Sequence, residues 1–285
     1  MKSITLTSKI LFLIPLIFFA VSAEAITKKD SLLMTYKLHN GQEYKLAYLM
    51  KNSVHTETMG YNIGLDQIMD TYYTASVTED SPSGYVLATR IDRITGSQKL
   101  MDSETFFDSQ NPTEPTDQMG KELREALNDL IGKVITMRID DRGQVLESNY
   151  LNLFSQASSG GLVMFDNSQT WYPVYSSKKV IQGSSWEHRV TIGSKGFAFD
   201  CIITYTLESF SKKRAYLKVS TVYGPVEGNE LNAVKGTATG TIQIDRKTGY
   251  PLESSTNQHL ELILEQQGMQ VMLKVDSDVT MKVIN

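Results

Sequence analysis

Apolar and polar side chains alternate with a period of two through most of the chain, the pattern of a strand with one buried and one solvated face. The clearest run is VMLKVDSDVTMKVI at 271–284. Its apolar face carries Val271, Leu273, Val275, Val279, Met281 and Val283, and its polar face carries Lys274, Asp276, Asp278, Thr280 and Lys282. At about 3.3 Å per residue this strand is roughly 40 Å long, which predicts a large, curved sheet.

Other segments repeat the alternation. HLELILE at 259–265 precedes the expected turn QQGM, so the last two strands form a long hairpin. YKLHNGQEYKLAYLM contains Asn40-Gly41, a strong hairpin signal, and AYLKVSTVY at 215–223 is typical of an antiparallel strand. We therefore expect a mainly β (α+β) fold: a large curved antiparallel sheet or incomplete barrel, with one or two helices on its concave face.

One segment has helical periodicity. After the polar stretch 102–118, the sequence MGKELREALNDLIG places apolar residues on a single helical stripe: Met119, Leu123, Ala126, Leu127, Leu130 and Ile131. Gly132 suits the C-terminal cap of this helix. A weaker helical candidate is NYLNLFSQASS, which ends at Gly160-Gly161. The sheet is expected to cover the apolar side of both helices.

A short motif recurs along the chain. TMRIDDRGQVLES at 136–148 and TIQIDRKTGYPLES at 241–254 share their order of Thr, Ile, Asp, Gly, Leu, Glu and Ser, and IDRITG at 91–96 is a third copy. Asp can accept backbone hydrogen bonds and Gly can take positive φ, so we interpret all three as hairpin turns. A calcium loop is the alternative, but the alternating ligands of an EF-hand are missing. The recurrence predicts pseudo-repeats at about 33–150 and 180–285, the first with a helical insertion.

The N-terminus has the features of a secretory signal peptide. Lys2 and Lys9 precede the apolar run LFLIPLIFFAV, which ends near Ala23-Glu24-Ala25. We expect residues 1–25 to be removed, leaving a single β-rich domain at 26–285 in the periplasm or outside the cell. No cysteine lies directly after the cleavage point, where the residues are Ile26, Thr27 and Lys28, and no other segment approaches the ~20 apolar residues of a membrane helix. The processed chain is therefore expected to carry no lipid anchor and not to span the membrane.

The net charge of the chain bears on which classes of partner it can bind. The chain has a formal net charge of −4, and loss of the signal makes it one unit more negative. Because no long basic run offsets this charge, nucleic acid is excluded as an expected partner. The single cysteine, Cys201, lies in the apolar run FAFDCIITYTL and is interpreted as a small buried hydrophobe.

No arrangement of residues indicates catalysis, a metal or a cofactor. The four histidines are His39, His55, His188 and His259. No serine lies in a G-x-S-x-G elbow, no H-E-x-x-H occurs, and Cys201 lacks ligands at zinc spacing. Glu187 and His188 should point to opposite faces of a strand. Glu147 and Glu253 occupy matching repeat positions and could converge, although solvated strands often carry such residues. GSKG at 193–196 is expected to be a hairpin turn and not a phosphate loop.

The segment TWYPVYSSKKVIQGSSWEHRV carries Pro173, Val180, Gly183, Ser185 and Trp186. In this order they resemble the signature of a family of exported, uncharacterised bacterial proteins. Ser184 departs from that signature, in which an acidic residue is common. The resemblance implies a fold like that of periplasmic lipoprotein carriers, and it assigns no catalytic residues.

Three functions are considered, in order. The first is binding of a lipid, acyl chain or lipoprotein segment in an apolar hollow beneath the helices, with the candidate lining residues Leu123, Leu127, Leu130, Phe154, Met164 and Phe165. The alternative for these residues is that they complete a dry core. The second function is a structural or interaction module of the cell envelope that meets a protein partner through a sheet edge or the 102–118 segment. An uncharacterised hydrolase is the third.

Overall fold

The computed structural model describes residues 30–58, 61–101, 103–111, 118–149, 172–194, 197–226, 233–266 and 269–284. The expected signal peptide lies outside these ranges. Within them, no helix has the length and hydropathy of a membrane span.

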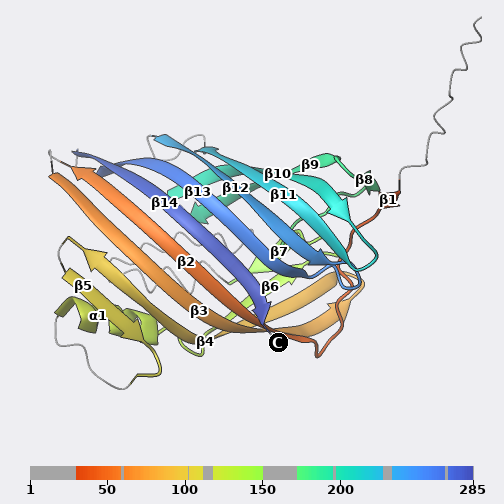
Figure 1. The fold of residues 1–285 in the computed structure, drawn as a ribbon, viewed down its shortest axis with the longest axis horizontal. Helices are drawn as coiled ribbons and strands as arrows, with labels where there is room; N and C mark the ends of the chain where they lie inside the picture. Colours follow the sequence, from red (N-terminus) through yellow and green to blue (C-terminus); the bar gives the residue numbers. More distant parts are fainter. Residues whose placement is uncertain are drawn as a thin grey trace, which may run out of the picture.

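Twelve strands form one antiparallel sheet that is not closed (Figure 1). The N-terminal part supplies β2 (Glu43–Thr58), β3 (Tyr61–Ser81), β4 (Gly84–Leu100), β5 (Ser103–Asp108), β6 (Val134–Ile139) and β7 (Val145–Ser148). The C-terminal part supplies β9 (Ser185–Ser194), β10 (Phe197–Phe210), β11 (Arg214–Pro225), β12 (Ala233–Asp245), β13 (Pro251–Gln266) and β14 (Met269–Ile284). A separate pair joins β1 (Ser31–Leu32) to β8 (Val180–Ile181).

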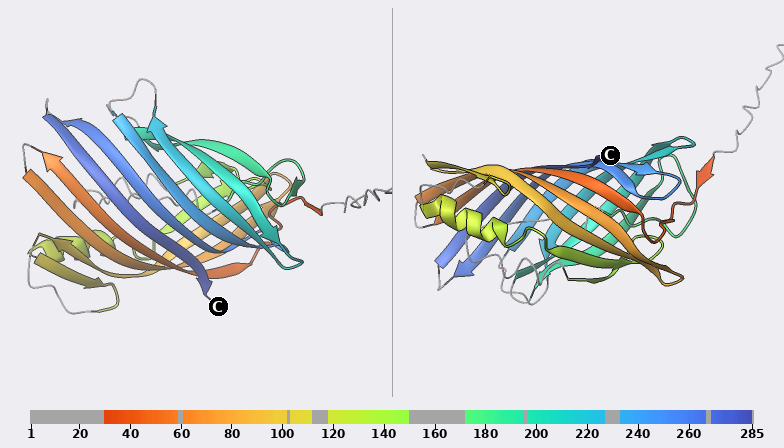
Figure 2. Two further views of the ribbon diagram at one scale, coloured as in Figure 1. Left: turned by 45° about the horizontal axis from the view of Figure 1, so that its top comes forward. Right: turned by 90° about the horizontal axis from the view of Figure 1, so that it is seen from below.

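The strand order is β7-β6-β4-β3-β2-β14-β13-β12-β11-β10-β9, with β5 beside β4. The two parts of the chain join where β2 pairs with β14. The sheet curls, so that β6 and β7 lie behind the wall formed by the C-terminal strands (Figure 2). The prediction of a mainly β fold with a large curved antiparallel sheet is confirmed, while the pseudo-repeat stays a prediction.

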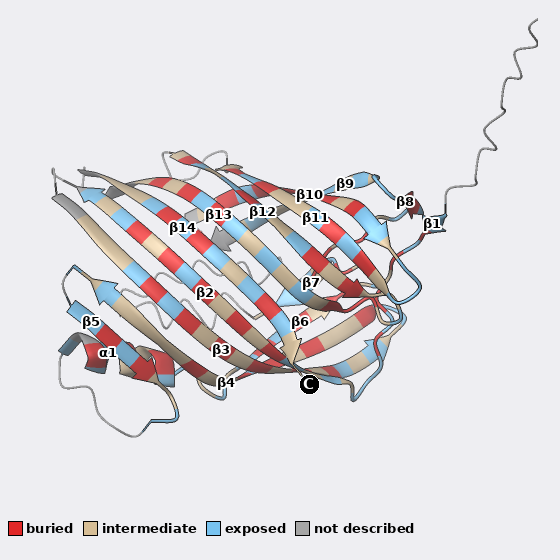
Figure 3. Cartoon of the chain, in the orientation of Figure 1, coloured by how far each residue is buried: buried red, intermediate tan, exposed pale blue. Residues whose placement is uncertain are grey.

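Burial alternates along the long strands, as the period-two pattern predicts (Figure 3). On β14, for example, Val275 is buried while Asp276 and Asp278 are exposed. The buried side chains of the strands, α1 and the segment 30–42 form one hydrophobic core cluster on the concave side. The convex side is solvated and carries cross-strand polar pairs such as His259 Nδ1 with Asp276 Oδ1 at 2.7 Å.

The predicted helix is confirmed as α1 (Gln118–Asn128), with Leu123 and Leu127 buried and α1 in contact with β5. The expected cap is wrong in position. The helix ends at Asn128, and Gly132 (φ +77°) lies four residues later, in a turn where its N–H donates to the Ile91 carbonyl. The second helical candidate lies outside the described residues.

Two of the three repeated motifs are hairpin turns, as predicted. Asp140 Oδ1 accepts from the N–H groups of Arg142 (2.9 Å) and Gln144 (2.8 Å), and the N–H of Gly249 donates to the Asp245 carbonyl at 2.7 Å. Both turns join neighbouring strands at the same end of the sheet, which we call the closed end.

The third copy is not a turn: residues 91–96 lie inside β4. A register shift opposite Tyr72 and Tyr73 leaves Asp92 as an extra residue in β4, and both Ile91 and Ile94 are therefore buried. Thr74 Oγ1 and Arg90 Nε donate to the Asp92 carboxylate. The sequence resembles a turn because the bulge uses the same Asp as a hydrogen-bond acceptor.

The Asn40-Gly41 prediction is half right. Gly41 has φ +84° and lies in a turn, but residues 33–39 form no strand of a hairpin. They continue an extended segment, residues 30–42, which we call the N-terminal strap and which crosses the closed end.

Candidate functional site

The N-terminal strap is tied to the closed end by backbone hydrogen bonds. The N–H of Tyr36 donates to the Asp141 carbonyl at 2.7 Å, and the N–H of Lys37 donates to the Thr248 carbonyl at 2.8 Å. One acceptor belongs to each repeated turn. The repeated motif therefore has a structural role, because its two turns hold the same strap from both walls of the sheet.

A second strap, residues 172–181, crosses the same end. The N–H of Tyr175 donates to the Arg142 carbonyl at 2.8 Å, and its hydroxyl donates to the Gly249 carbonyl at 2.5 Å. A Cβ on Gly143 or Gly249 would lie closer than 3.0 Å to strap atoms, and both glycines have positive φ. Glycine is thus required here for its conformation and for the close approach of the straps.

Aromatic rings fill the closed end. Trp186 Nε1 donates to the Val174 carbonyl at 2.7 Å, and its ring stacks on Tyr205 at 5.7 Å between centroids. Tyr44 stacks on Tyr250 at 3.7 Å. Burial raises the pKa of Tyr205 to about 12 and that of Tyr250 well above its usual range. Trp186, on β9, therefore ties the second strap to the sheet.

Nearer the opposite, open end, polar side chains cross the concave face in one line. Eight polar or charged residues are buried among those described, and six of these lie in a single cross-strand row. We call this set the polar row: Thr105, Gln67, Asn52, Ser277, Gln258 and Thr221, each 4–6% exposed. Cross-strand pairing joins the members on β3, β2, β14 and β13 directly. Gln98 links Gln67 to Thr105 on β5, and Ala238 links Gln258 to Thr221 on β11. Paired residues share a face of the sheet, so the row is continuous.

Rows rich in apolar residues flank the polar row on both sides. Two residues toward the closed end, Met69 pairs with Met50 and Met50 with Val279. Two residues toward the open end, the continuous pairing of four strands includes Leu65, Val54, Val275 and Leu260. The polar row is therefore a band of amides and hydroxyls between two rows rich in apolar residues, and further hydroxyls such as those of Thr71 and Thr256 lie on the same face.

One atom of the row has no hydrogen-bond partner within the described ranges. Asn52 Nδ2 lies 3.2 Å from Met50 Sδ, a weak acceptor, and Asn52 Oδ1 is buried without a partner. Thr71 Oγ1, on the same face, is in the same situation. A buried polar group without a partner costs about 1–3 kcal/mol, so Asn52 and Thr71 lower the stability of the fold as the structure shows it.

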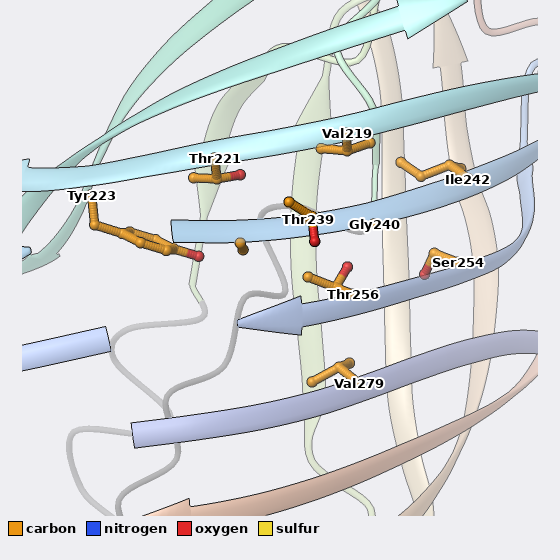
Figure 4. Close-up of a pocket in the computed structure, with 10 residues that line it drawn as sticks. Val219, Thr221, Tyr223, Thr239, Gly240, Ile242, Ser254, Thr256 and Val279 are labelled. Carbon is orange, nitrogen blue, oxygen red and sulfur yellow. The ribbon is translucent and has the colours of Figure 1, made fainter. Parts of the chain in front are cut away.

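A hollow in the concave face lies against β11 to β14, beside the Thr221 end of the row (Figure 4). It exists because these strands carry small residues at this level: Ala238, Gly240, Ser254 and Thr256. A Cβ on Gly240 would lie closer than 3.0 Å to the Ser255 carbonyl oxygen. The cavity volume is ≈ 30 Å³, room for water but far below the roughly 300–1,000 Å³ of ligand pockets.

The predicted lining residues are only partly placed. Leu123, Leu127 and Leu130 are buried in the same core cluster as the concave face, while Phe154, Met164 and Phe165 lie outside the described residues. As ligand contacts, all six stay predictions.

Sequence reasoning missed the polar row, although a signal was present. The inward alternation of 271–284 is interrupted by Ser277, and that of 46–54 by Asn52. Each polar residue alone looks like an imperfection of a strand. Only the register brings them into one line.

The titratable groups are arranged as expected. Cys201 is 1% exposed, and burial raises the pKa of its thiol to about 12, which makes it unreactive. Glu187 is exposed while His188 pairs with the buried Ile203, so the two do point to opposite faces. Burial lowers the pKa of His188, which favours its neutral form on the concave side.

The carboxylates do not show the convergence that was considered. Glu147, on the edge strand β7, lies 3.9 Å from the guanidinium of Arg138. Glu253, on β13, pairs in register with Gln243 and Lys282. The two carboxylates thus lie on strands that are not neighbours.

Part of the chain matches a protein family whose function is unknown. Residues 157–251 match DUF6263, a family of unknown function. The matched range contains Pro173, Gly183 and Trp186, and the predicted resemblance to an uncharacterised domain family is confirmed. Export and a lipoprotein-carrier-like fold stay predictions.

No curated protein matches the chain. Among solved structures, one that describes lipid–protein interactions in lipovitellin is similar to this chain. The alignment covers 87% of this chain and 26% of the lipovitellin chain, at 10% sequence identity and a TM-score of 0.48. The chain thus spans about a quarter of the lipovitellin length. OccK11 (OpdR) of Pseudomonas aeruginosa aligns with 88% of this chain and 100% of its own, at 9% identity and a TM-score of 0.20.

Proposed function

We propose that this chain is an exported, non-enzymatic envelope protein that binds a lipid or another hydrophobic ligand on the concave face of its sheet. The observation that supports the proposal is the hollow in that face, lined by Val219, Ile242 and Val279 together with small residues. At ≈ 30 Å³ the hollow has room only for water, so the proposal depends on the small side chains there leaving more space when the sheet opens.

The hollow must widen to accept an acyl chain. The sheet is not closed, and its edge strands β7 and β9 are not paired with each other. Separating these edges breaks no ladder hydrogen bonds, while the straps keep the closed end together. We therefore propose that ligand enters from the open end.

A matched pair of substitutions on β11 tests the site. Val219 lines the hollow, and Val222, 54% exposed, lies on the convex face of the same strand. The Val219→Phe variant should fill the hollow and weaken binding of a fluorescent fatty-acid analogue at least tenfold. Val222→Phe should bind like the unaltered protein.

Native mass spectrometry of gently purified protein provides an independent readout. A co-purified lipid that is lost in Val219→Phe would support the proposal. If the unaltered protein neither retains a lipid nor binds the fatty-acid analogue, the proposal fails.

A second candidate, a protein-interaction module of the envelope, is favoured by an exposed apolar pair on the convex face. Phe106 is 70% exposed and Ile68 is 45% exposed, and both pair in register with Ser97 between them. Photocrosslinking from position 106 in living cells should trap one defined partner, with position 222 as the control. Absence of a specific product at 106 would remove this candidate.

A further inference from the structure

The polar row has the chemistry of a site for an uncharged polar group. Its six members are amides and hydroxyls, which both donate and accept hydrogen bonds, and none carries a charge. His188 extends the line on β9, next to Ile203, and burial favours its neutral form. A carboxylate or phosphate would find no cation in this line to compensate its desolvation.

The position of the row within the face determines the shape of a matching ligand. From Gln67, the same face of β3 continues past Thr71 to Tyr73 near the closed end and to Ile63 near the open end. At about 3.3 Å per residue, these arms measure roughly 20 Å and 13 Å. A ligand lying along the strands would thus have its polar group in the middle and hydrocarbon on both sides.

We propose that the polar row binds the ester linkage of a neutral lipid, with the hydrocarbon chains lying on the apolar rows to either side. The inference rests on the proposed function and specifies its ligand class. Asn52 Nδ2, now 3.2 Å from a methionine sulfur, would donate to the ester carbonyl. Its Oδ1, buried without a partner among the described residues, would be available to a hydroxyl such as that of a partial glyceride.

Three probes of equal chain length separate the possibilities: decyl decanoate with a central ester, heneicosane with no polar group, and icosanoate with a terminal carboxylate. Each is delivered from cyclodextrin to the full processed chain and competes with an uncharged fluorescent lipid probe, such as the methyl ester of a fluorescent fatty acid. We expect the ester to bind about tenfold more tightly than the hydrocarbon, as one or two neutral hydrogen bonds would give.

The Asn52→Leu variant should lose this preference and bind ester and hydrocarbon within about threefold of each other. Asn257→Leu is the matched control, because Asn257 is exposed on the convex face and donates to Asp278 at 2.7 Å. It should retain the full preference. Ser277→Ala, a milder change in the same row, should reduce the preference about threefold and keeps the test valid if Asn52→Leu does not fold.

The outcomes distinguish this inference from the function beneath it. Equal binding of ester and hydrocarbon by the unaltered protein, or a preference for icosanoate, would overturn the role of the polar row and leave hydrophobic-ligand binding standing. An ester preference that Asn52→Leu and Ser277→Ala leave unchanged would also overturn it. If no probe binds and the fluorescent analogue fails as well, the proposed function itself is wrong.

Discussion

The closed end and the polar row both bury polar atoms, but they treat them differently. At the closed end, the hydroxyl of Tyr175 and the indole nitrogen of Trp186 donate to strap or turn carbonyls. In the polar row, Asn52 Oδ1 has no partner among the described residues. Buried groups with partners hold a fold together, whereas a buried group without one reduces stability. The donors of Tyr175 and Trp186 therefore stabilise the closed end, whereas Asn52 Oδ1 lowers stability. Arg246 Nε, in a turn of the closed end, is likewise buried without a partner among the described residues.

The largest effect should come from the closed end. Gly249→Ala is expected to lower the free energy of unfolding by about 3 kcal/mol or more, because its Cβ would meet the Thr35 carbonyl of the strap and its φ is +73°. Gly41→Ala is the matched control: φ is +84° but no atom lies within 4 Å of the new Cβ. It should cost about 1 kcal/mol in urea denaturation, and equal losses in the two variants would show that the strap contact does not matter.

Alkaline pH should weaken the same region. The pKa of Tyr205 is raised to about 12 in the folded chain, so the unfolded state releases its proton first, near pH 10. Stability is therefore complete below pH 10 and falls as pH rises toward 12, by up to about 3 kcal/mol from this group. Denaturation measured between pH 9 and 12 should show a shallower decline for Tyr205→Phe. Parallel curves for the two proteins would contradict the assignment.

Removing the hydrogen-bonded hydroxyl of Tyr175 should lower the free energy of unfolding by less than Gly249→Ala does. Tyr175→Phe deletes the donor to the Gly249 carbonyl while keeping the ring, and it should destabilise the protein by about 1–2 kcal/mol. Because the lost contact joins a strap to a turn, hydrogen exchange should also increase at Gly249 more than in β13. Unchanged stability would mean that the strap is held by burial alone.

Substitution in the polar row should raise the free energy of unfolding, whereas the substitutions at the closed end lower it. Asn52→Leu replaces an incompletely paired amide by an apolar side chain of similar volume, and without ligand it should raise the free energy of unfolding by about 1 kcal/mol. Thermal and urea denaturation of the ligand-free protein would measure this, with Asn257→Leu as the variant expected to gain nothing. A clear loss of stability in Asn52→Leu would place the row with the closed end as a structural feature.

The sequence by itself determined the local structure, because local structure follows from spacing. A period of two in 215–223 and 271–284 predicts strands with one wet face, and the stripe through Leu123 and Leu127 predicts the helix. Asp followed three or four residues later by Gly predicts turns. The prediction failed at 91–96 because Asp92 there is the extra residue of a bulge inside β4.

Tertiary structure alone decided what the pieces do together. Nothing local indicates that the repeated turns clamp one strap, since the strap reaches each of them from more than a hundred residues away. The polar row likewise consists of single interruptions on separate strands, and only the register aligns Gln67, Asn52, Ser277 and Gln258. Register depends on all the strand pairs at once, so a candidate site built across strands is invisible until the sheet is assembled.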